Sequence, residues 1–245
     1  MTKSEIQFVQ SLQLKKHRDA HHLFVAEGKK IVSDLQQRLK PKYIYTTEHN
    51  ATAASATLIS EAEMKKITSL TTPPSVLGIF EQPQHCTDID FSAKWTLALD
   101  DVQDPGNVGT IIRLCDWFGI ETLLCSLHTA DCYAPKVVQA TMGAIARIRV
   151  LYVDLAPFLE QKGVPVYGTF LEGDNIYFAD LQQSGVVVLG SEGQGISKEV
   201  FAVAHTKLHI PSFSNDRSSE SLNVASAAAV VCSEIGRRNM VDNLL

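Results

Sequence analysis

Three short segments of the sequence carry polar residues and glycines at spacings that could do chemistry. In the first, Asp100–Gly119 (DDVQDPGNVGTIIRLCDWFG), acidic residues and a Pro-Gly turn precede Asn107, and Arg113 follows. Asn107 can cap the backbone amides at the start of a helix. A guanidinium fixed at the end of a sheet would bind phosphate or stabilise a developing negative charge. The spacing also allows a plainer role for Arg113, an ion pair with Asp116 on the helix surface.

The second segment, Gly185–Ser197 (GVVVLGSEGQGIS), is an apolar strand that runs directly into a glycine-rich loop containing Glu192. Glycines at the carboxyl end of a strand let the backbone approach a ligand without interference from Cβ atoms. The glycines follow the order G-x-x-G-x-G, which differs from the G-x-G-x-x-G of dinucleotide-binding loops. His209-Ile210-Pro211 also stands where such a site would have an acidic residue for the ribose. The sequence therefore gives little support to a nicotinamide site. Taken alone, the loop could be only a turn.

The third segment, Leu208–Arg238, contains a short strand that ends at Ile210-Pro211, a polar loop and an alanine-rich helix. Ser221 or Asn223 can cap that helix. Its alanines favour close approach of another element, which ordinary core packing would also explain.

Together the three segments resemble a known family. The N-x-G-x-x-x-R of Asn107–Arg113, the L-G-S-E-G of Leu189–Gly193 and the I-P…S-L-N-V of Ile210–Val224 are similar to the three motifs of the SpoU (TrmH-type) RNA 2′-O-ribose methyltransferases, in the SPOUT superfamily. The resemblance covers about residues 95–238. More loosely, FVAEGKKIV at Phe24–Val32 resembles the small substrate-binding domain that often precedes this catalytic domain.

The resemblance implies an α/β domain with a C-terminal deep trefoil knot, which would be an exception to the general absence of knots. It implies S-adenosylmethionine as cofactor, ribosomal or transfer RNA as substrate, a homodimer formed through the C-terminal domain, and in-line attack of a ribose 2′-oxygen on the sulfonium methyl. The positions that match the family's polar catalytic residues are Asn107, Arg113, Glu192, Ser221 and Asn223. Those expected to line the cofactor pocket are Thr169, Leu171, Leu189, Gly190, Ile210 and Leu222.

One part of the third motif departs from the family pattern. Nine residues, Ser212–Glu220, separate Pro211 from Ser221, where the family usually has a shorter loop containing Met and Gly. The strand and helix on either side still match. The departure affects the expected loop contacts of Ser218, Ser219 and Glu220.

The elements that must position these residues fall into two parts. Residues 1–80 alternate helical and strand patterns in a small α/β unit, and the polar, aperiodic residues 81–93 form a linker. Residues 94–245 alternate apolar strands with helices, which predicts a parallel sheet covered on both faces. In the first part, the pattern predicts helices over 4–18, 28–39 and 60–67 and strands over 23–26, 42–46 and 76–80.

The charge is unevenly distributed along the chain. The net charge is −5, but residues 1–42 hold nine basic and four acidic residues, or +5, which leaves −10 for the remaining residues. This basic excess is either a solvated helix face or an electrostatic footprint for a polyanion. With the resemblance, it predicts RNA contacts by Lys15, Lys16, Arg18, Lys29 and Lys30.

Composition restricts the remaining classes. The five cysteines form no C-x-x-C pair, the first residues are charged, and no stretch reaches the ~20 apolar residues of a spanning helix. We therefore expect a cytoplasmic protein with no membrane or metal partner. His17 with His21 and His128 with Cys132 have metal-ligand spacing but lack further ligands nearby, and no G-x-S-x-G nucleophile elbow occurs. Two other classes stay open: a catalytically inactive RNA-binding protein of the same fold, and a nucleotide-dependent oxidoreductase.

Overall fold

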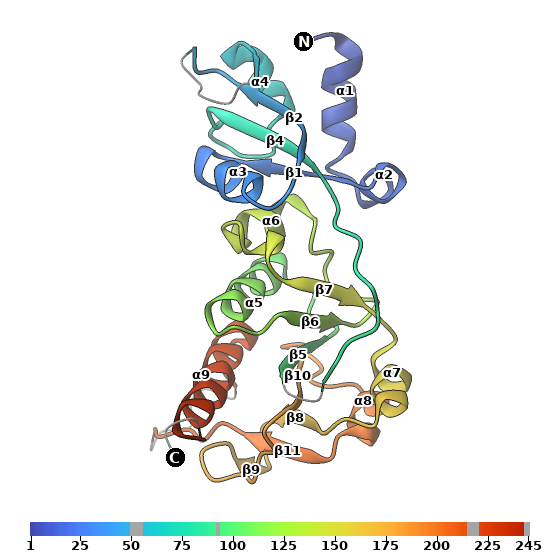
Figure 1. Ribbon diagram of the computed structural model, residues 1–245, viewed down its shortest axis with the longest axis vertical. Helices are drawn as coiled ribbons and strands as arrows, with labels where there is room; N and C mark the ends of the chain where they lie inside the picture. Colours follow the sequence, from blue (N-terminus) through green and yellow to red (C-terminus); the bar gives the residue numbers. More distant parts are fainter. Residues whose placement is uncertain (50–55, 92–93, 215–220, 243–245) are drawn as a thin grey trace. The chain divides into compact units, whose positions relative to one another are not determined.

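The computed structural model describes residues 1–49, 56–91, 94–214 and 221–242, which form two compact units (Figure 1). Unit 1 comprises Met1–Gln84 together with Asp131–Arg147, and unit 2 comprises His85–Ala130 and Ile148–Leu245. The predicted contacts of Ser218, Ser219 and Glu220 lie outside the described residues. No helix in the described part of the chain is long and apolar enough to cross a membrane.

Unit 1 is built on a four-stranded sheet in the order β1-β4-β2-β3. β4 runs antiparallel to both β1 and β2, and β3 runs parallel to β2. A core of Val9, Leu12, Leu23, Leu77 and Ile79 holds the N-terminal helix on this sheet. The strands are β1 (Leu23–Glu27), β2 (Pro41–Thr46), β3 (Thr57–Leu58) and β4 (Val76–Glu81). The helices before Gln84 are α1 (Lys3–Ser11), α2 (Lys15–His21), α3 (Lys29–Gln36) and α4 (Glu61–Ile67).

The single helix predicted over residues 4–18 is wrong, because the chain turns between α1 and α2. The backbone of Leu14 is extended, with φ −95° and ψ 133°. The turn exposes the carbonyls of Leu12 and Gln13, and the Arg18 guanidinium donates hydrogen bonds to both, at 2.9 and 2.7 Å. A side chain six residues away thus satisfies the backbone groups that a continuous helix would have paired.

Unit 1 also includes a segment from the middle of the sequence, α6 (Pro135–Thr141) and the 3₁₀ turn η1 (Ala144–Ala146). α6 packs against β1. The Tyr133 ring lies 4.9 Å from the Phe24 ring, centroid to centroid, and Arg18 pairs with Asp131 at 2.6 Å. The predicted division of the chain at residues 81–93 does not foresee that this segment joins the N-terminal part.

Unit 2 contains a seven-stranded sheet in the order β7-β6-β5-β10-β8-β11-β9, in which all the pairs are parallel. The predicted α/β class and parallel sheet are therefore confirmed, and the knot stays a prediction. The strands are β5 (Trp95–Asp100), β6 (Thr122–Cys125), β7 (Arg149–Tyr152), β8 (Val166–Phe170), β9 (Asp174–Asn175), β10 (Gly185–Gly190) and β11 (Thr206–His209). The helices are α5 (Pro105–Trp117), α7 (Leu155–Lys162), α8 (Lys198–Val203) and α9 (Val224–Asp242).

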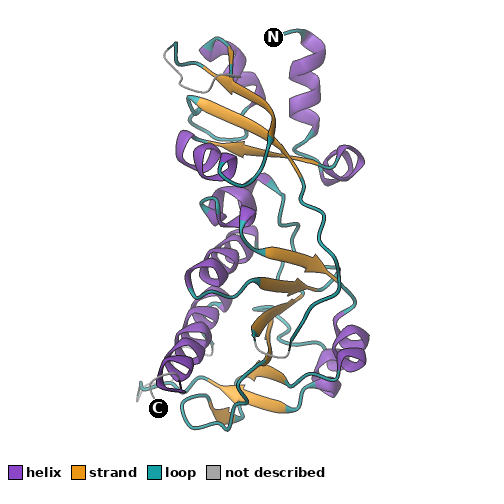
Figure 2. Cartoon of the chain, viewed as in Figure 1, coloured by secondary structure: helices purple, strands orange, loops and turns teal. Residues whose placement is uncertain are grey.

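Helices cover both faces of this sheet. In Figure 2 the packed pair α5 and α9 lies on one side and the packed pair α7 and α8 on the other. Every residue of β5 is buried, as is β10 up to Leu189, as expected for central parallel strands. One side of the core joins Ala98 and Val188 to Leu155, Leu159 and Val200 of α7 and α8.

Candidate active site

The central strands β5 and β10 end side by side, and the candidate catalytic residues gather at this carboxyl edge. Asp100 pairs with Gly190 in the parallel register. The loop after β5 leads to Asn107, and the loop after β10 carries Glu192. α9 begins at the same edge, directly after Asn223.

Asn107 does not cap α5, which corrects the sequence-based prediction. The helix begins at Pro105, and the Asp104 carboxylate accepts the Asn107 backbone N–H at 2.8 Å. Asn107 lies in the first turn of α5, so its side chain is available to contact a segment that is distant in the sequence. Its Nδ2 donates to Glu192 Oε1 at 3.1 Å.

Asn223 completes this site while capping α9. Its Oδ1 accepts the backbone N–H groups of Ala225 and Ser226 at 3.0 and 3.3 Å. Its Nδ2 donates to Asn107 Oδ1 at 3.0 Å and to Glu192 Oε1 at 2.5 Å. Of the two predicted caps, Asn223 is therefore the one used, and it joins three distant segments in what we term the Asn–Glu–Asn cluster (Asn107, Glu192 and Asn223).

The glycine-rich loop that carries Glu192 is a closed structure. Ser191 N donates to Gly195 O at 3.0 Å, and Gly195 N donates to Ser191 O at 2.8 Å. A Cβ atom on Gly190 would lie 2.2 Å from the Gly195 carbonyl carbon, so only glycine fits there. Gly195 has φ +70°, which glycine adopts at no steric cost. These contacts hold Glu192 in a defined position at the end of β10.

Asp100 is a supporting residue that the sequence analysis did not single out. Its side chain is buried at the end of β5, and its Oδ2 accepts the Ser197 backbone N–H at 2.7 Å. This bond joins β5 to the residue that caps α8. The pair of acidic residues at the end of an apolar strand was the available signal, but the pattern does not show which of the two is buried.

Arg113 and Ser221, the two other predicted catalytic residues, lie nearby with exposed side chains. Arg113 follows Asn107 by six residues on α5, a rise of about 9 Å. Ser221 lies two residues before Asn223. Among the described residues, neither side chain is hydrogen-bonded to the Asn–Glu–Asn cluster.

The residues predicted to line a cofactor pocket come from the same edge of the sheet. Thr169 and Leu171 lie at the end of β8, and Thr169 Oγ1 donates to Val188 O at 3.1 Å. Gly190 ends β10, and Ile210 directly follows β11, which pairs with β8. Leu171 is 65% exposed and Leu222 51%, whereas Leu189 is buried within β10. Two exposed leucines therefore accompany the carboxyl ends of the neighbouring strands β10, β8 and β11.

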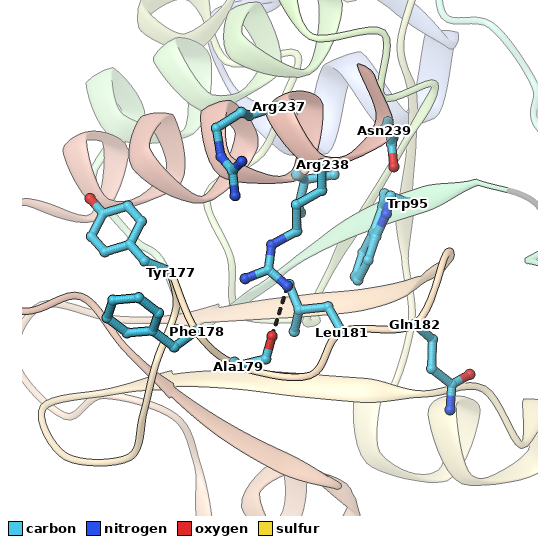
Figure 3. A pocket seen from close by; sticks show the side chains of 10 residues that line it. Trp95, Tyr177, Phe178, Ala179, Leu181, Gln182, Arg237, Arg238 and Asn239 are labelled. Atoms are coloured by element: carbon cyan, nitrogen blue, oxygen red, sulfur yellow. Dashed lines mark hydrogen bonds between the residues drawn. The ribbon is translucent and has the colours of Figure 1, made fainter. Parts of the chain in front are cut away.

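A pocket of about 310 Å³ lies at the opposite, amino-terminal edge (Figure 3). Trp95, which begins β5, lines it together with Arg237 and Arg238 near the end of α9. Arg238 donates to the carbonyls of Ile176 and Ala179, and buried Glu234 accepts from both arginines. The Arg237 hydrogen bond is the main cause that lowers the pKa of Glu234. This network anchors α9 to the segment after β9 and lies away from the Asn–Glu–Asn cluster.

In the described ranges, no group of three His, Cys, Asp or Glu side chains is arranged to hold a metal ion. All five cysteines are thiols, four of them buried and Cys86 exposed.

The predicted RNA-binding residues of unit 1 differ in their surroundings. Lys15, Lys16, Lys29 and Lys30 are exposed, although Lys15 pairs with Asp19 at 3.9 Å and Lys29 with Glu48 at 3.0 Å. Arg18 is 3% exposed, and its guanidinium is bound to Asp131 and two carbonyls. Because these contacts occupy the guanidinium, we assign Arg18 a structural role and leave it out of the RNA-binding set.

Comparisons with known proteins identify the family. A model described as the SpoU rRNA methylase family matches residues 94–233, more than half of the chain. The chain belongs to this family. An MRM3-like substrate-binding domain model matches residues 3–78 of the same SpoU-family chain.

Relatives of this SpoU-family chain extend over nearly its whole length. It is 29% identical to the 23S rRNA (guanosine(2553)-2'-O)-methyltransferase RlmP of Bacillus subtilis, over 90% of this chain and 91% of the relative. A structure from Porphyromonas gingivalis, assigned to the TrmH family of RNA methyltransferases, is 38% identical, covers 97% of this chain and 99% of that one, and has a TM-score of 0.84. An AdoMet-bound rRNA methyltransferase from Sinorhizobium meliloti is 29% identical, with coverage of 97% and 96% and a TM-score of 0.85.

Proposed function

We propose that this SpoU-family chain is an S-adenosylmethionine-dependent methyltransferase that modifies the 2′-oxygen of a ribose in structured RNA. The observation that carries the proposal is the Asn–Glu–Asn cluster, in which residues 107, 192 and 223 meet through hydrogen bonds of 2.5–3.1 Å. The three family motifs meet there, at the carboxyl edge of a parallel sheet, where open α/β sheets bind their ligands. The relatives that are named as 23S rRNA methyltransferases favour ribosomal RNA as the substrate.

The carboxyl edge of unit 2 has the chemistry that S-adenosylmethionine requires. Leu171, Ile210 and Leu222 offer apolar contacts for an adenosine and a methionine side chain. Gly190 lets the loop backbone at Gly195 and Ile196 pack directly against the end of β10, which fixes the backbone groups that would meet the cofactor. Thr169 and buried Leu189 shape the strand ends behind them. When bound, the cofactor supplies an electrophilic sulfonium methyl and its own leaving group.

The chain itself must then position the ribose 2′-hydroxyl and manage its proton. The Asn–Glu–Asn cluster forms the base of the site, and the exposed side chain of Ser221 lies beside it. Arg113 extends from the exposed side of α5, where its guanidinium would clamp the target phosphate and stabilise the developing 2′-alkoxide. A guanidinium pKa above about 12 disfavours Arg113 as the base itself.

Arg113→Lys tests the clamp. Lysine keeps the charge but lacks the fork that binds two phosphate oxygens, so methyl transfer should fall by about tenfold or more. Initial rates with labelled S-adenosylmethionine, compared with the control Lys198→Arg at an exposed position of α8, measure it. Near-normal turnover of Arg113→Lys would contradict a role in which Arg113 binds two phosphate oxygens.

The remaining parts of the proposal concern assembly and location. We place RNA binding on the exposed lysines of unit 1 (Lys15, Lys16, Lys29 and Lys30), and propose a cytoplasmic homodimer that pairs through unit 2. The large exposed side chains of Trp117 and Met240, on α5 and α9, support such a contact. Sedimentation of the purified chain tests it, since a monomer at micromolar concentration would contradict the dimer.

Mapping of 2′-O-methylated nucleotides in total RNA, with and without the gene, tests the activity. We expect one site to lose its methyl group in the deletion strain, to regain it with the wild-type gene, and to regain less methylation with Glu192→Gln than with the wild-type gene. Loss of no site, together with RNA binding by the purified chain, would instead favour an inactive RNA-binding protein.

A further inference from the structure

Unit 1 contains a pocket of about 430 Å³ that lies apart from the exposed lysines discussed above. It is formed where α2 ends, where the chain leaves α3 and where β4 ends. These three points lie together because β4 pairs with β1, which follows α2, and with β2, which follows α3. Its lining includes His21, His22, Arg38, Lys40, Glu81 and Gln82.

The lining of this pocket is cationic. Arg38 and Lys40 are both exposed, and within the described ranges neither side chain has an ion-pair partner. The imidazoles of His21 and His22 add two further donors, whereas Glu81 is the single acidic residue of the lining. Two full positive charges and two imidazoles around one concave surface match a phosphate group rather than an apolar ligand.

Contacts between the lining residues and with their neighbours hold the walls of the pocket in place. Gln82 N donates to His22 O at 2.8 Å, and the Gln82 side chain donates to Leu23 O at 3.2 Å. His22 has φ +52°, a left-handed conformation that is uncommon outside glycine and here ends α2. The His21 ring packs edge-on against Phe8, with centroids 5.2 Å apart. The imidazoles are therefore presented by a fixed backbone.

We propose that this pocket binds a backbone phosphate of the RNA substrate. The inference rests on the proposed function and adds a second contact site to unit 1. Lys29 and Lys30 begin α3, whereas Arg38 and Lys40 follow its end, so the two sites are separated by about 12 Å, the length of this eight-residue helix. An RNA strand that contacts both ends of α3 would be fixed in direction as well as position, which a single basic patch does not achieve.

The double variant Arg38→Ala/Lys40→Ala tests the pocket in the full chain. The matched control is Lys65→Ala/Lys66→Ala, which removes the same charge from exposed positions in the last turn of α4. The probe is purified total ribosomal RNA, and affinity is measured between 50 and 200 mM salt, roughly the range over which phosphate contacts dominate. We expect the pocket variant to bind about tenfold more weakly and its salt slope to fall by roughly 0.7 to 0.9, the change for one lost phosphate contact, and the control to change affinity less than about twofold.

A variant of opposite sign sharpens the test. Glu81→Gln removes the only carboxylate of the lining and should strengthen binding of the same RNA by a few fold. Thermal unfolding is measured in parallel, because a role limited to stabilising the end of α3 would lower Tm without changing affinity.

The outcomes separate this proposal from the proposed function. Equal losses in the pocket and control variants, no loss in either, or a wild-type chain that does not bind RNA would overturn the pocket. A response of the pocket to inorganic phosphate alone, with RNA affinity unchanged in the variant, would also overturn it. Methyl transfer by the wild-type chain is assayed with the same RNA, so its absence despite RNA binding contradicts only the proposed function.

Discussion

Glu192 is the residue on which the candidate site depends most. One of its carboxylate oxygens accepts hydrogen bonds from the Asn107 and Asn223 side chains and a longer one, at 3.4 Å, from Val224 N. Three donors from two other segments thus converge on one anionic acceptor, and charge-assisted hydrogen bonds are about twice as strong as neutral ones. Glu192 therefore holds the start of α5 and the start of α9 in register.

Glu192→Gln should separate this positioning role from cofactor binding. The amide is neutral and presents an N–H group that competes with the three donors, so we expect methyl transfer to fall about tenfold to hundredfold. Affinity for S-adenosylmethionine, measured by calorimetry, should change less than about threefold, because the backbone at Gly190 is unaltered. Glu199→Gln, at an exposed position on α8, serves as the control. Wild-type turnover in Glu192→Gln would contradict the role.

The cysteines give a residue-scale test of the core. Burial is the main cause that raises the pKa of Cys232 to about 12 and the pKa of Cys115 well above its ordinary value. At pH 8 the thiolate fraction of Cys232 is therefore on the order of 0.01%. We expect an alkylating reagent to modify only Cys86 in the folded chain and all five cysteines after unfolding, counted by mass spectrometry. Native labelling should disappear in Cys86→Ser, and rapid labelling of Cys115 in the fold would refute the packing of α5.

At the scale of elements, local sequence patterns predict where strands and helices lie better than they predict which strands pair. Apolar runs located strands β1, β2, β4 and β10, whereas the two-residue strands β3 and β9 show no such run. The sequence analysis predicts Asn107 as the cap of α5, although Pro105 at the first helical position indicates Asp104. The strand order, with β10 between β5 and β8, depends on contacts between distant residues that no local pattern encodes.

The loop after β10 provides a prediction about one element. Gly190→Ala would place a Cβ atom 2.2–2.4 Å from the backbone of Gly195 and Ile196, which cannot move without opening the loop. We expect a loss of stability of about 3 kcal/mol, or roughly 6–12 °C in Tm for a chain of this size, together with lost methyl transfer. Gly193→Ala lies in the same loop with nothing within 4 Å of the new Cβ atom, so it should leave Tm unchanged. Similar Tm values for the two variants would refute the tight loop.

At the scale of the whole molecule, neither the charge pattern nor the order of the sequence predicts which segments form unit 1. Residues 131–147 follow β6 in the sequence, yet they belong to the unit that contains β1. Their attachment depends on the Arg18–Asp131 pair, with side chains 3% and 13% exposed, and on the Phe24–Tyr133 ring contact. A basic residue within a basic segment gave no sign of this role, because sequence position does not show which charge is buried.

Arg18→Ala tests this attachment against the alternative that Arg18 binds RNA. Removing the guanidinium leaves the Asp131 carboxylate and two carbonyls without their partner, so we expect unit 1 to lose about 3–5 kcal/mol of stability. Lys16→Ala removes the same charge from an exposed position of the same helix and should not change stability measurably. Urea unfolding of both variants, followed by circular dichroism, measures the difference. If Arg18→Ala keeps wild-type stability but weakens RNA binding, Arg18 contacts RNA directly and the buried pair does not hold unit 1 together.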